Sequence, residues 1–287
     1  MFDPETNKFP YPLHTDEHYL KLKKNRGITF DSDYPYVDNR LSFRMGSFFL
    51  RILLNVIVFP VVRIRMGLKV KGKENLKKHR DVINKGIISC CNHVHMWDYL
   101  GILSAIAPIK PYILIWAANI NGEWGTMMRH VGGIPIPEES TKATLSYLRA
   151  IKKLLKEGIW LHIYAEGSMW EYYKPIRPFK KGVAFLACDC DKPVLPMAFT
   201  YRKPNFIRKH IFKQLACFTL NIGEPIYRDN SLSAKDQRTD LTKRAHQAVC
   251  RLAGINPEEN IYPAVFDNTE RVDYYTDTYG VGYKGSC

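Results

Sequence analysis

The sequence has 287 residues and is 46% hydrophobic, which is enough for one large folded domain with appendages and argues against a disordered chain. Its net charge of +14 favours acidic partners, namely nucleic acid, anionic lipid or phosphorylated substrates. The seven cysteines lack zinc-site spacing and include the close pairs Cys90–Cys91 and Cys188–Cys190, so we expect reduced thiols in a cytoplasmic protein.

The first 40 residues are rich in Tyr, Pro, Asp and Lys and show no periodicity, so we expect an irregular arm over 1–40. This arm lacks the basic segment followed by an apolar segment that marks a secretory signal. Residues 41–66 follow with a pattern typical of a helix. Polar residues at helical spacing form a narrow stripe on it, and large apolar residues fill the rest of its circumference. The polar residues are Arg44, Ser47, Arg51 and Asn55.

This apolar helix is expected to meet a membrane. A bilayer span needs about 20 apolar residues without charges, but Arg51 lies inside the segment and Pro60 is expected to break or kink it. We therefore predict a helical segment over 41–68 that lies in the membrane interface rather than crossing it. The alternative is a helix docked on the protein's own core. Between Arg40 and Arg80 the chain has eleven Lys or Arg residues and one acidic residue, which favours an anionic lipid surface as partner.

Short apolar runs alternate with helical patterns through the rest of the chain. Strands are expected at 86–91, 112–117, 133–136, 159–165, 194–200 and 218–222, and helices at 97–107, 122–130, 140–157, 182–190 and 233–253. This alternation predicts an α/β domain over 69–255, with a largely parallel or mixed central sheet flanked by helices. Residues 256–287 are expected to form a C-terminal tail that is loosely held after Asp267.

The first expected strand of this domain runs directly into a His and an Asp that are five residues apart. His93 and Asp98 would point about 140° apart inside one regular helix. They can meet only if His93 lies in the turn before the helix and Asp98 lies in its first turn. Asp98 would then accept a hydrogen bond from one ring nitrogen and leave the other nitrogen free to act as a base.

The sequence around this pair resembles the glycerolipid acyltransferase family, which includes the 1-acylglycerol-3-phosphate acyltransferases. Asn92–Asp98 resembles the NHx₄D block of that family. Three further blocks follow in the family's order, at Gly132–Ile136, Ala165–Ser168 and Val194–Ala198. Smaller similarities occur at Gly72–Leu76, which is similar to the family's opening strand, and at Phe179–Gly182. Together they cover about residues 45–225, and the terminal arms lie outside the resemblance.

The resemblance implies an O-acyltransferase that moves a fatty acyl chain from acyl-CoA or acyl-carrier protein to the hydroxyl of a lysophospholipid. The leading acceptor is 1-acyl-glycerol-3-phosphate, which would give phosphatidic acid. His93 would take the proton from the acceptor hydroxyl, and Asp98 would orient His93. Backbone N–H groups at the start of the following helix could hold the developing oxyanion. Neither a cofactor nor a metal is expected beyond the two substrates.

The resemblance also implies an acceptor site. Gly133, Glu166, Gly167 and Ser168 carry over as substrate-binding residues, because they occupy the family's second and third blocks. We therefore expect these four residues to shape the pocket that holds the acceptor.

Two positions depart from the family pattern. Arginines associated with the acceptor phosphate are replaced here by Pro137 and Met169. Their loss would cost affinity for a phosphorylated acceptor. We expect nearby cations to replace them, namely Lys180, Lys181 and Arg177; an exposed basic loop is the alternative interpretation of these residues.

Other function classes fit the sequence less well. A different acceptor, such as another lysophospholipid or an amino or hydroxy lipid, and a non-enzymatic lipid-binding relative stay open. A metal site at His93, His95 and Asp98 lacks further histidines at set spacing. A serine hydrolase would need G-x-S-x-G, and a nucleic-acid binder would need a base-reading module. We expect no nucleic-acid partner and a location on the cytoplasmic face of a membrane, as a peripheral or monotopic protein.

Overall fold

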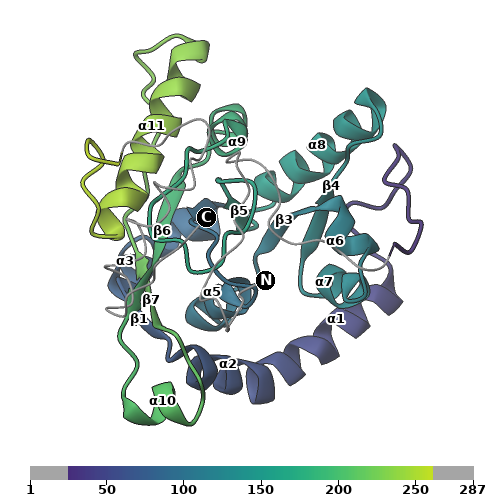
Figure 1. The fold of residues 1–287 in the computed structure, drawn as a ribbon. Helices are drawn as coiled ribbons and strands as arrows, with labels where there is room; N and C mark the ends of the chain where they lie inside the picture. Colours follow the sequence, from purple (N-terminus) through teal and green to yellow (C-terminus); the bar gives the residue numbers. More distant parts are fainter. Residues whose placement is uncertain (1–24, 261–287) are drawn as a thin grey trace, which may run out of the picture.

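A seven-stranded mixed sheet organises the computed structural model, which describes residues 25–260 (Figure 1). Its spatial order is β1-β7-β6-β2-β5-β3-β4. The strands are β1 (Lys69–Lys71), β2 (Ile88–Cys91), β3 (Tyr112–Trp116), β4 (Gly133–Ile136), β5 (Leu161–Tyr164), β6 (Val194–Arg202) and β7 (Cys217–Ile222). Strands β6, β2, β5, β3 and β4 are parallel, whereas β7 pairs antiparallel with β6 and parallel with β1. The predicted mixed α/β fold is confirmed.

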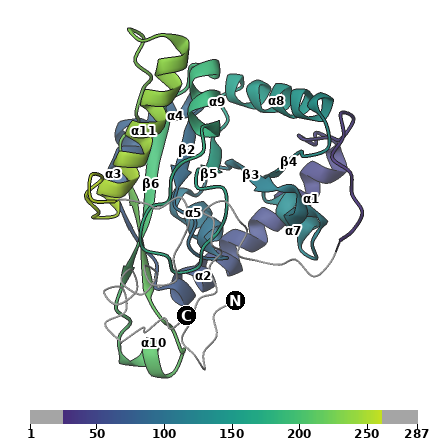
Figure 2. The same ribbon diagram turned by 45° about the horizontal axis from the view of Figure 1, so that its top comes forward.

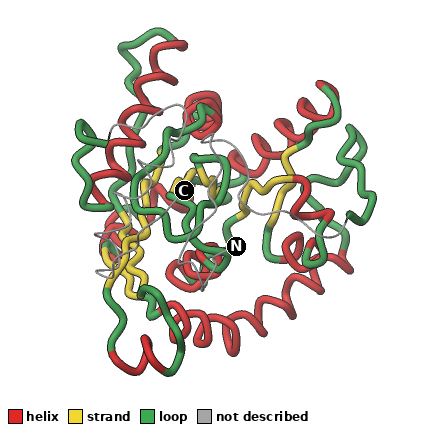
Figure 3. The backbone as a smooth tube through the Cα atoms, viewed as in Figure 1, coloured by secondary structure: helices red, strands yellow, loops and turns green. Residues whose placement is uncertain are grey.

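Helices cover both faces of this sheet (Figure 3). One hydrophobic core lies under α8 (Thr141–Lys156), α9 (Gly182–Cys190) and α11 (Ala234–Leu252). The core of the other face lies under α5 (Asp98–Ile106) and the C-terminal part of the apolar helix. Shorter helices are α3 (Lys73–Lys78), α4 (Arg80–Asn84), α6 (Ala117–Asn121), α7 (Gly125–His130) and α10 (Phe206–His210). Apolar side chains on both faces of the strands therefore pack against helices.

The apolar helix runs without a break from Leu41 to Met66, so of the expected break or kink at Pro60 the break is wrong. It consists of α1 (Leu41–Leu53), a π-helical turn η1 (Leu54–Val58) and α2 (Phe59–Met66). In the π turn the N–H of Phe59 donates to the carbonyl of Leu54, five residues back. Pro60 then falls in the first turn of α2, where a residue without an N–H fits.

The same helix both docks on the domain and exposes apolar surface. Its buried residues are Leu54, Phe59, Val62 and Met66. The exposed ones are Leu41, Met45, Phe48, Phe49, Ile52, Leu53, Val56, Ile57, Val61 and Ile64. Among residues 25–260 this is the one helix whose length of 26 residues and composition would suit a membrane span. The helix thus docks on the protein's own core through one face and leaves an apolar face exposed to solvent.

The block Gly72–Leu76 and the N-terminal arm differ in part from the sequence expectations. The block Gly72–Leu76 does not form the opening strand; β1 ends at Lys71, and Gly72, with a φ of +78°, starts helix α3. The part of the arm from residue 25 to residue 40 is irregular as expected, yet Phe30 and Tyr36 are buried in the core under α8. The tail after Asp267 and the first 24 residues lie outside the described residues.

Candidate active site

The loop between β2 and α5 brings His93 and Asp98 together. His93 lies two residues after β2, and Asp98 is the first residue of α5. His93 Nδ1 lies 2.8 Å from Asp98 Oδ2. The geometry expected from the five-residue spacing, with His93 in the turn and Asp98 in the first helical turn, is confirmed.

Asp98 is completely buried and accepts several hydrogen bonds. Besides His93, the N–H groups of Val94 and His95 donate to its Oδ2 at 3.0 and 3.3 Å, and the Tyr164 hydroxyl donates to its Oδ1 at 2.6 Å. Burial alone would raise the pKa of Asp98, but the charge of His93 and these donors lower it below its ordinary value. The loop amides of Val94 and His95 are therefore directed at the Asp98 carboxylate.

The ring of His93 is held in one orientation but reaches solvent. It stacks on the Tyr164 ring with centroids 3.7 Å apart and planes 9° apart, and its side chain is 24% exposed. Because a carboxylate can only accept, Nδ1 carries the proton of the neutral ring and Nε2 is the acceptor. Among residues 25–260 no hydrogen bond to Nε2 is found. A substrate hydroxyl can occupy that place.

The backbone around His93 is fixed from two neighbouring strands. The His93 N–H donates to Glu166 Oε2 at 3.1 Å, and the Trp170 N–H donates to the His93 carbonyl at 3.0 Å. On the β6 side, the Asn92 amide exchanges two hydrogen bonds with the backbone of Phe199, at 3.0 and 2.8 Å. The Asn and Glu of the two motif blocks therefore position the loop that carries His93.

Arg177 lies inside the protein, which differs from its expected place at the acceptor phosphate. Its side chain is 0% exposed, and Nη2 contacts Glu166 Oε2 at 2.8 Å. Nη1 donates to Ser168 Oγ at 2.6 Å, Nη2 donates to the Ser168 carbonyl, and the guanidinium lies 4.6 Å from the centroid of the Trp170 ring. Arg177 thus neutralises and positions Glu166, and Ser168 is a buried partner of Arg177.

Two exposed lysines follow this buried group. The aliphatic part of Lys180 lies over Gly167, so close that a Cβ on Gly167 would come within 2.7 Å of Lys180 Cε. Gly167 also has a φ of +84°, which disfavours other residues. Lys181 is exposed at the start of α9. Of the two lysines, Lys180 is thus the one that contacts the Glu-Gly-Ser block.

Gly133 is not brought next to His93. It lies on β4, at the edge of the sheet, whereas β5 and β3 separate β4 from β2. Three strand spacings amount to about 14 Å. A Cβ on Gly133 would collide with Ile115 and Met128, so its small size serves the packing of β4 on β3 and α7.

Residues 67–200 match the family model described as Acyltransferase. This part of the chain is an acyltransferase domain, as the sequence blocks predicted. A search of curated proteins found no match. Solved structures similar to this acyltransferase include the 1-acyl-sn-glycerophosphate (LPA) acyltransferase PlsC from Thermotoga maritima, with 17% identity, 74% of this chain and 95% of that chain covered, and a TM-score of 0.46. His93, Asp98 and Glu166 lie within the residues that the family model matches.

The other histidines near the site of this acyltransferase are packing residues. Burial lowers the pKa of His95 to about 4 and that of His162 to about 3, so both are neutral at pH 7. His95 packs against Phe218, and His162 Nδ1 lies 2.8 Å from Ser89 Oγ. Within residues 25–260 no three His, Cys, Asp or Glu side chains group as metal ligands would.

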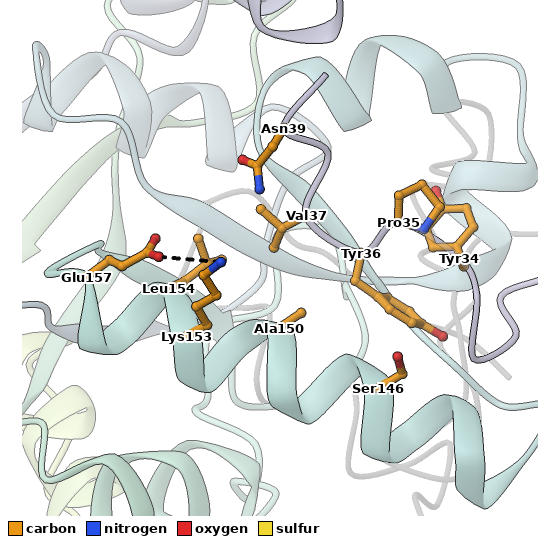
Figure 4. Close-up of a pocket in the computed structure, with 10 residues that line it drawn as sticks. All are labelled: Tyr34, Pro35, Tyr36, Val37, Asn39, Ser146, Ala150, Lys153, Leu154 and Glu157. Carbon is orange, nitrogen blue, oxygen red and sulfur yellow. Dashed lines mark ion pairs between the residues drawn. The ribbon is translucent and has the colours of Figure 1, made fainter. Parts of the chain in front are cut away.

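Two hollows on the surface of the acyltransferase lie away from His93. One of about 250 Å³ lies between the arm, which contributes Tyr36 to its lining, and α8, which contributes Ser146 (Figure 4). Another of about 420 Å³ lies against the apolar helix, between Pro60 and Ser104. Neither includes a residue of the His93 loop, so neither is assigned to the reaction.

Tyr164 was not found from the sequence, although it ends the strand next to β2 and contacts both His93 and Asp98. Tyr164→Phe keeps the stacked ring and removes only the hydrogen bond to Asp98. We expect kcat to fall about tenfold with KM unchanged, because a hydrogen bond to a charged group is worth about 1.5–3 kcal/mol. The pKa of Asp98 should also rise, because the Tyr164 hydroxyl is one of the donors that lower it, and the acid limb of the pH–rate profile should therefore move to higher pH. An unaltered kcat and pH profile would assign Tyr164 to packing alone.

Proposed function

We propose that this acyltransferase moves a fatty acyl chain from acyl-CoA or acyl-carrier protein to the hydroxyl of a lysophospholipid, with His93 as general base. The leading acceptor is 1-acyl-glycerol-3-phosphate, and the product would be phosphatidic acid. One observation carries the proposal: His93 Nδ1 is 2.8 Å from a buried carboxylate of Asp98, and its Nε2 faces no described partner. This arrangement suits the removal of a proton from a hydroxyl.

Two proton transfers through His93 make up the proposed reaction. His93 Nε2 accepts the hydroxyl proton as the acceptor oxygen attacks the thioester carbonyl carbon. The tetrahedral intermediate then breaks its carbon–sulfur bond, and the leaving thiolate takes the proton back from His93. Asp98 stabilises the imidazolium between these two steps, and the lowered pKa of Asp98 keeps it ionised at neutral pH. No covalent acyl-enzyme and no cofactor enter the scheme.

Lys180 is the cation that we propose for the acceptor phosphate in place of the family arginines. It is exposed and contacts Gly167, whose neighbour Glu166 holds the backbone of His93. Lys180→Ala should raise KM for 1-acyl-glycerol-3-phosphate about tenfold, as expected for one charge-assisted hydrogen bond, with little change in kcat. Lys181→Ala is the matched control and should have the smaller effect. Equal KM values for Lys180→Ala and wild type would remove Lys180 from the acceptor site.

An acceptor panel tests the proposed function most directly. Labelled acyl-CoA and acyl-carrier protein would each be offered with 1-acyl-glycerol-3-phosphate, other lysophospholipids, and amine or hydroxyl lipids. We expect transfer to a lysophospholipid hydroxyl and the highest kcat/KM with the phosphate monoester. Preference for an uncharged acceptor would favour the alternative head group, and binding without transfer to any acceptor would favour a lipid-binding relative.

We further propose that the protein acts on the cytoplasmic face of a membrane, as a peripheral or monotopic protein. The exposed apolar residues of helix 41–66 support contact with the acyl-chain boundary. Basic residues along and after this helix, from Arg40 to Arg80, support contact with anionic lipid head groups. The acceptor would then reach the enzyme from the bilayer in which it resides.

A further inference from the structure

A second exposed apolar patch lies on the segment that connects β6 to β7. We call residues 203–213, which include α10, the α10 hairpin. Four large apolar side chains on it are exposed to solvent: Phe206 (75%), Ile207 (52%), Ile211 (67%) and Phe212 (48%). Such a cluster on so short a segment is not explained by packing within the described residues, because none of the four joins a core cluster.

The charge of the α10 hairpin is uniformly basic. It carries Lys203, Arg208, Lys209 and Lys213, and no acidic residue occurs between Asp191 and Glu224. Apolar side chains interleaved with cations are typical of segments that enter the head-group region of an anionic bilayer. A protein partner would have to match both an apolar patch and an all-positive rim.

The α10 hairpin is fixed next to the C-terminal end of the apolar helix. Arg208 Nη1 donates to the carbonyl of Ile64 at 2.6 Å, and Arg65 Nη1 donates to the carbonyl of Phe212 at 3.0 Å. Arg208 also bonds Gln214 Oε1 at 3.0 Å, which closes the base of the hairpin. In Figures 1 and 2, α10 and α2 lie side by side. The exposed apolar surface of the helix, which ends at Ile64, therefore continues onto the hairpin.

The α10 hairpin and His93 both follow the carboxyl ends of strands in the sheet. Strands β2, β5 and β6 are parallel, so their carboxyl ends, which carry His93, Glu166 and the hairpin respectively, point the same way. Strand β6 extends six residues beyond its last pairing with β2, from Pro196 to Arg202. That is about 20 Å of strand, so the hairpin projects beyond the loop that carries His93.

We propose that the α10 hairpin is a second membrane-inserting element, which enters the same anionic bilayer surface as helix 41–66. This inference rests on the membrane location proposed above. A single helix lying in an interface can roll about its axis, whereas two separate contacts fix the orientation of the domain. When the helix and the hairpin both contact the bilayer, the carboxyl ends of the strands, where His93 lies, face the membrane. A lipid acceptor would then reach His93 from the bilayer.

The test measures binding of the full chain to vesicles of phosphatidylcholine with and without phosphatidylglycerol. The double variant Phe206→Ser/Ile211→Ser removes the two most exposed apolar side chains and leaves the Asn205 cap of α10 intact. We expect its partition onto vesicles that contain phosphatidylglycerol to be about tenfold weaker than that of wild type. Leu145→Ser is the matched control, because Leu145 is 52% exposed on α8, away from α10 (Figure 1), and it should bind as wild type does.

Hydrogen exchange gives a second readout that needs no mutation. Amides of residues 206–213 should exchange more slowly when the wild-type chain is bound to the vesicles, and those around Leu145 should not change. Equal partition of wild type and double variant, or unchanged exchange at 206–213, would overturn the proposal. A wild-type dimer in the absence of lipid, which becomes a monomer in the double variant while vesicle binding is unaltered, would also overturn it and assign the patch to self-association.

Both readouts are independent of catalysis. If the wild-type chain transferred no acyl group, the proposed function would fail while the vesicle comparison could still be made. Acyl transfer to a short-chain acceptor that is monomeric in solution should be the same in wild type and double variant, because the hairpin contributes no residue to the His93 loop.

Discussion

His93→Ala should lower acyl transfer about 10³-fold, to the background of the assay, while the protein stays folded. The imidazole supplies general-base catalysis, which is typically worth 10²–10⁴-fold. The fold should tolerate the change, because the His93 side chain lies in a loop and is 24% exposed. The backbone of that loop is held through its N–H by Glu166 and through its carbonyl by Trp170, and neither contact uses the imidazole. Steady-state kinetics and the thermal unfolding midpoint would be measured together.

His93→Gln sharpens this experiment. Its side-chain amide can still donate to Asp98, but it has no basic nitrogen, so its activity should be as low as that of His93→Ala. His79→Ala, at the junction of α3 and α4, is the control and should keep full activity. Activity of both His93 variants within a few-fold of wild type would remove His93 as the base and with it the proposed mechanism.

The pairing of His93 and Asp98 could be predicted from sequence because it depends on local geometry. Five residues between a strand end and a helical first turn allow few other arrangements. Tyr164 could not be predicted in this way, because its contact with His93 depends on the pairing of β2 with β5, which are 73 residues apart in the register Cys91↔Tyr164. The strand order that creates this contact is not encoded in any one segment.

Burial was the property that sequence predicted least well. Arg177 lies in a run of polar and aromatic residues that suggests an exposed loop, yet its guanidinium is enclosed by Glu166 and Trp170. The sequence does not show whether a charged residue is buried against a residue of opposite charge from a distant part of the chain. The apolar helix is a second example. Pro60 suggested a break or kink, but the helix continues because a π-helical turn precedes α2 and Pro60 lies in the first turn of α2. Which apolar residues of this helix are exposed depends on tertiary packing.

The Arg177–Glu166 pair gives the largest expected effect on stability. Both side chains are buried, with 0% and 2% exposed, and Glu166 also accepts from the backbone N–H groups of His93 and Arg177. Arg177→Met keeps the volume but leaves the Glu166 carboxylate without a counter-charge. Breaking a buried pair by removing one partner costs about 3–5 kcal/mol. The urea unfolding midpoint should fall accordingly, and activity should fall with it because Glu166 positions the backbone of His93.

A double-mutant cycle separates this supporting role from contact with the acceptor. In Glu166→Gln/Arg177→Met no buried charge is left alone, so part of the lost stability should return, and the coupling free energy should exceed about 1 kcal/mol. Lys181→Met is the matched control for loss of an exposed cation and should alter stability by less than about 0.5 kcal/mol. If Arg177 bound the acceptor phosphate instead, Arg177→Met would raise KM for a phosphorylated acceptor while the urea midpoint stayed at the wild-type value. The two roles thus predict opposite patterns in the same pair of measurements.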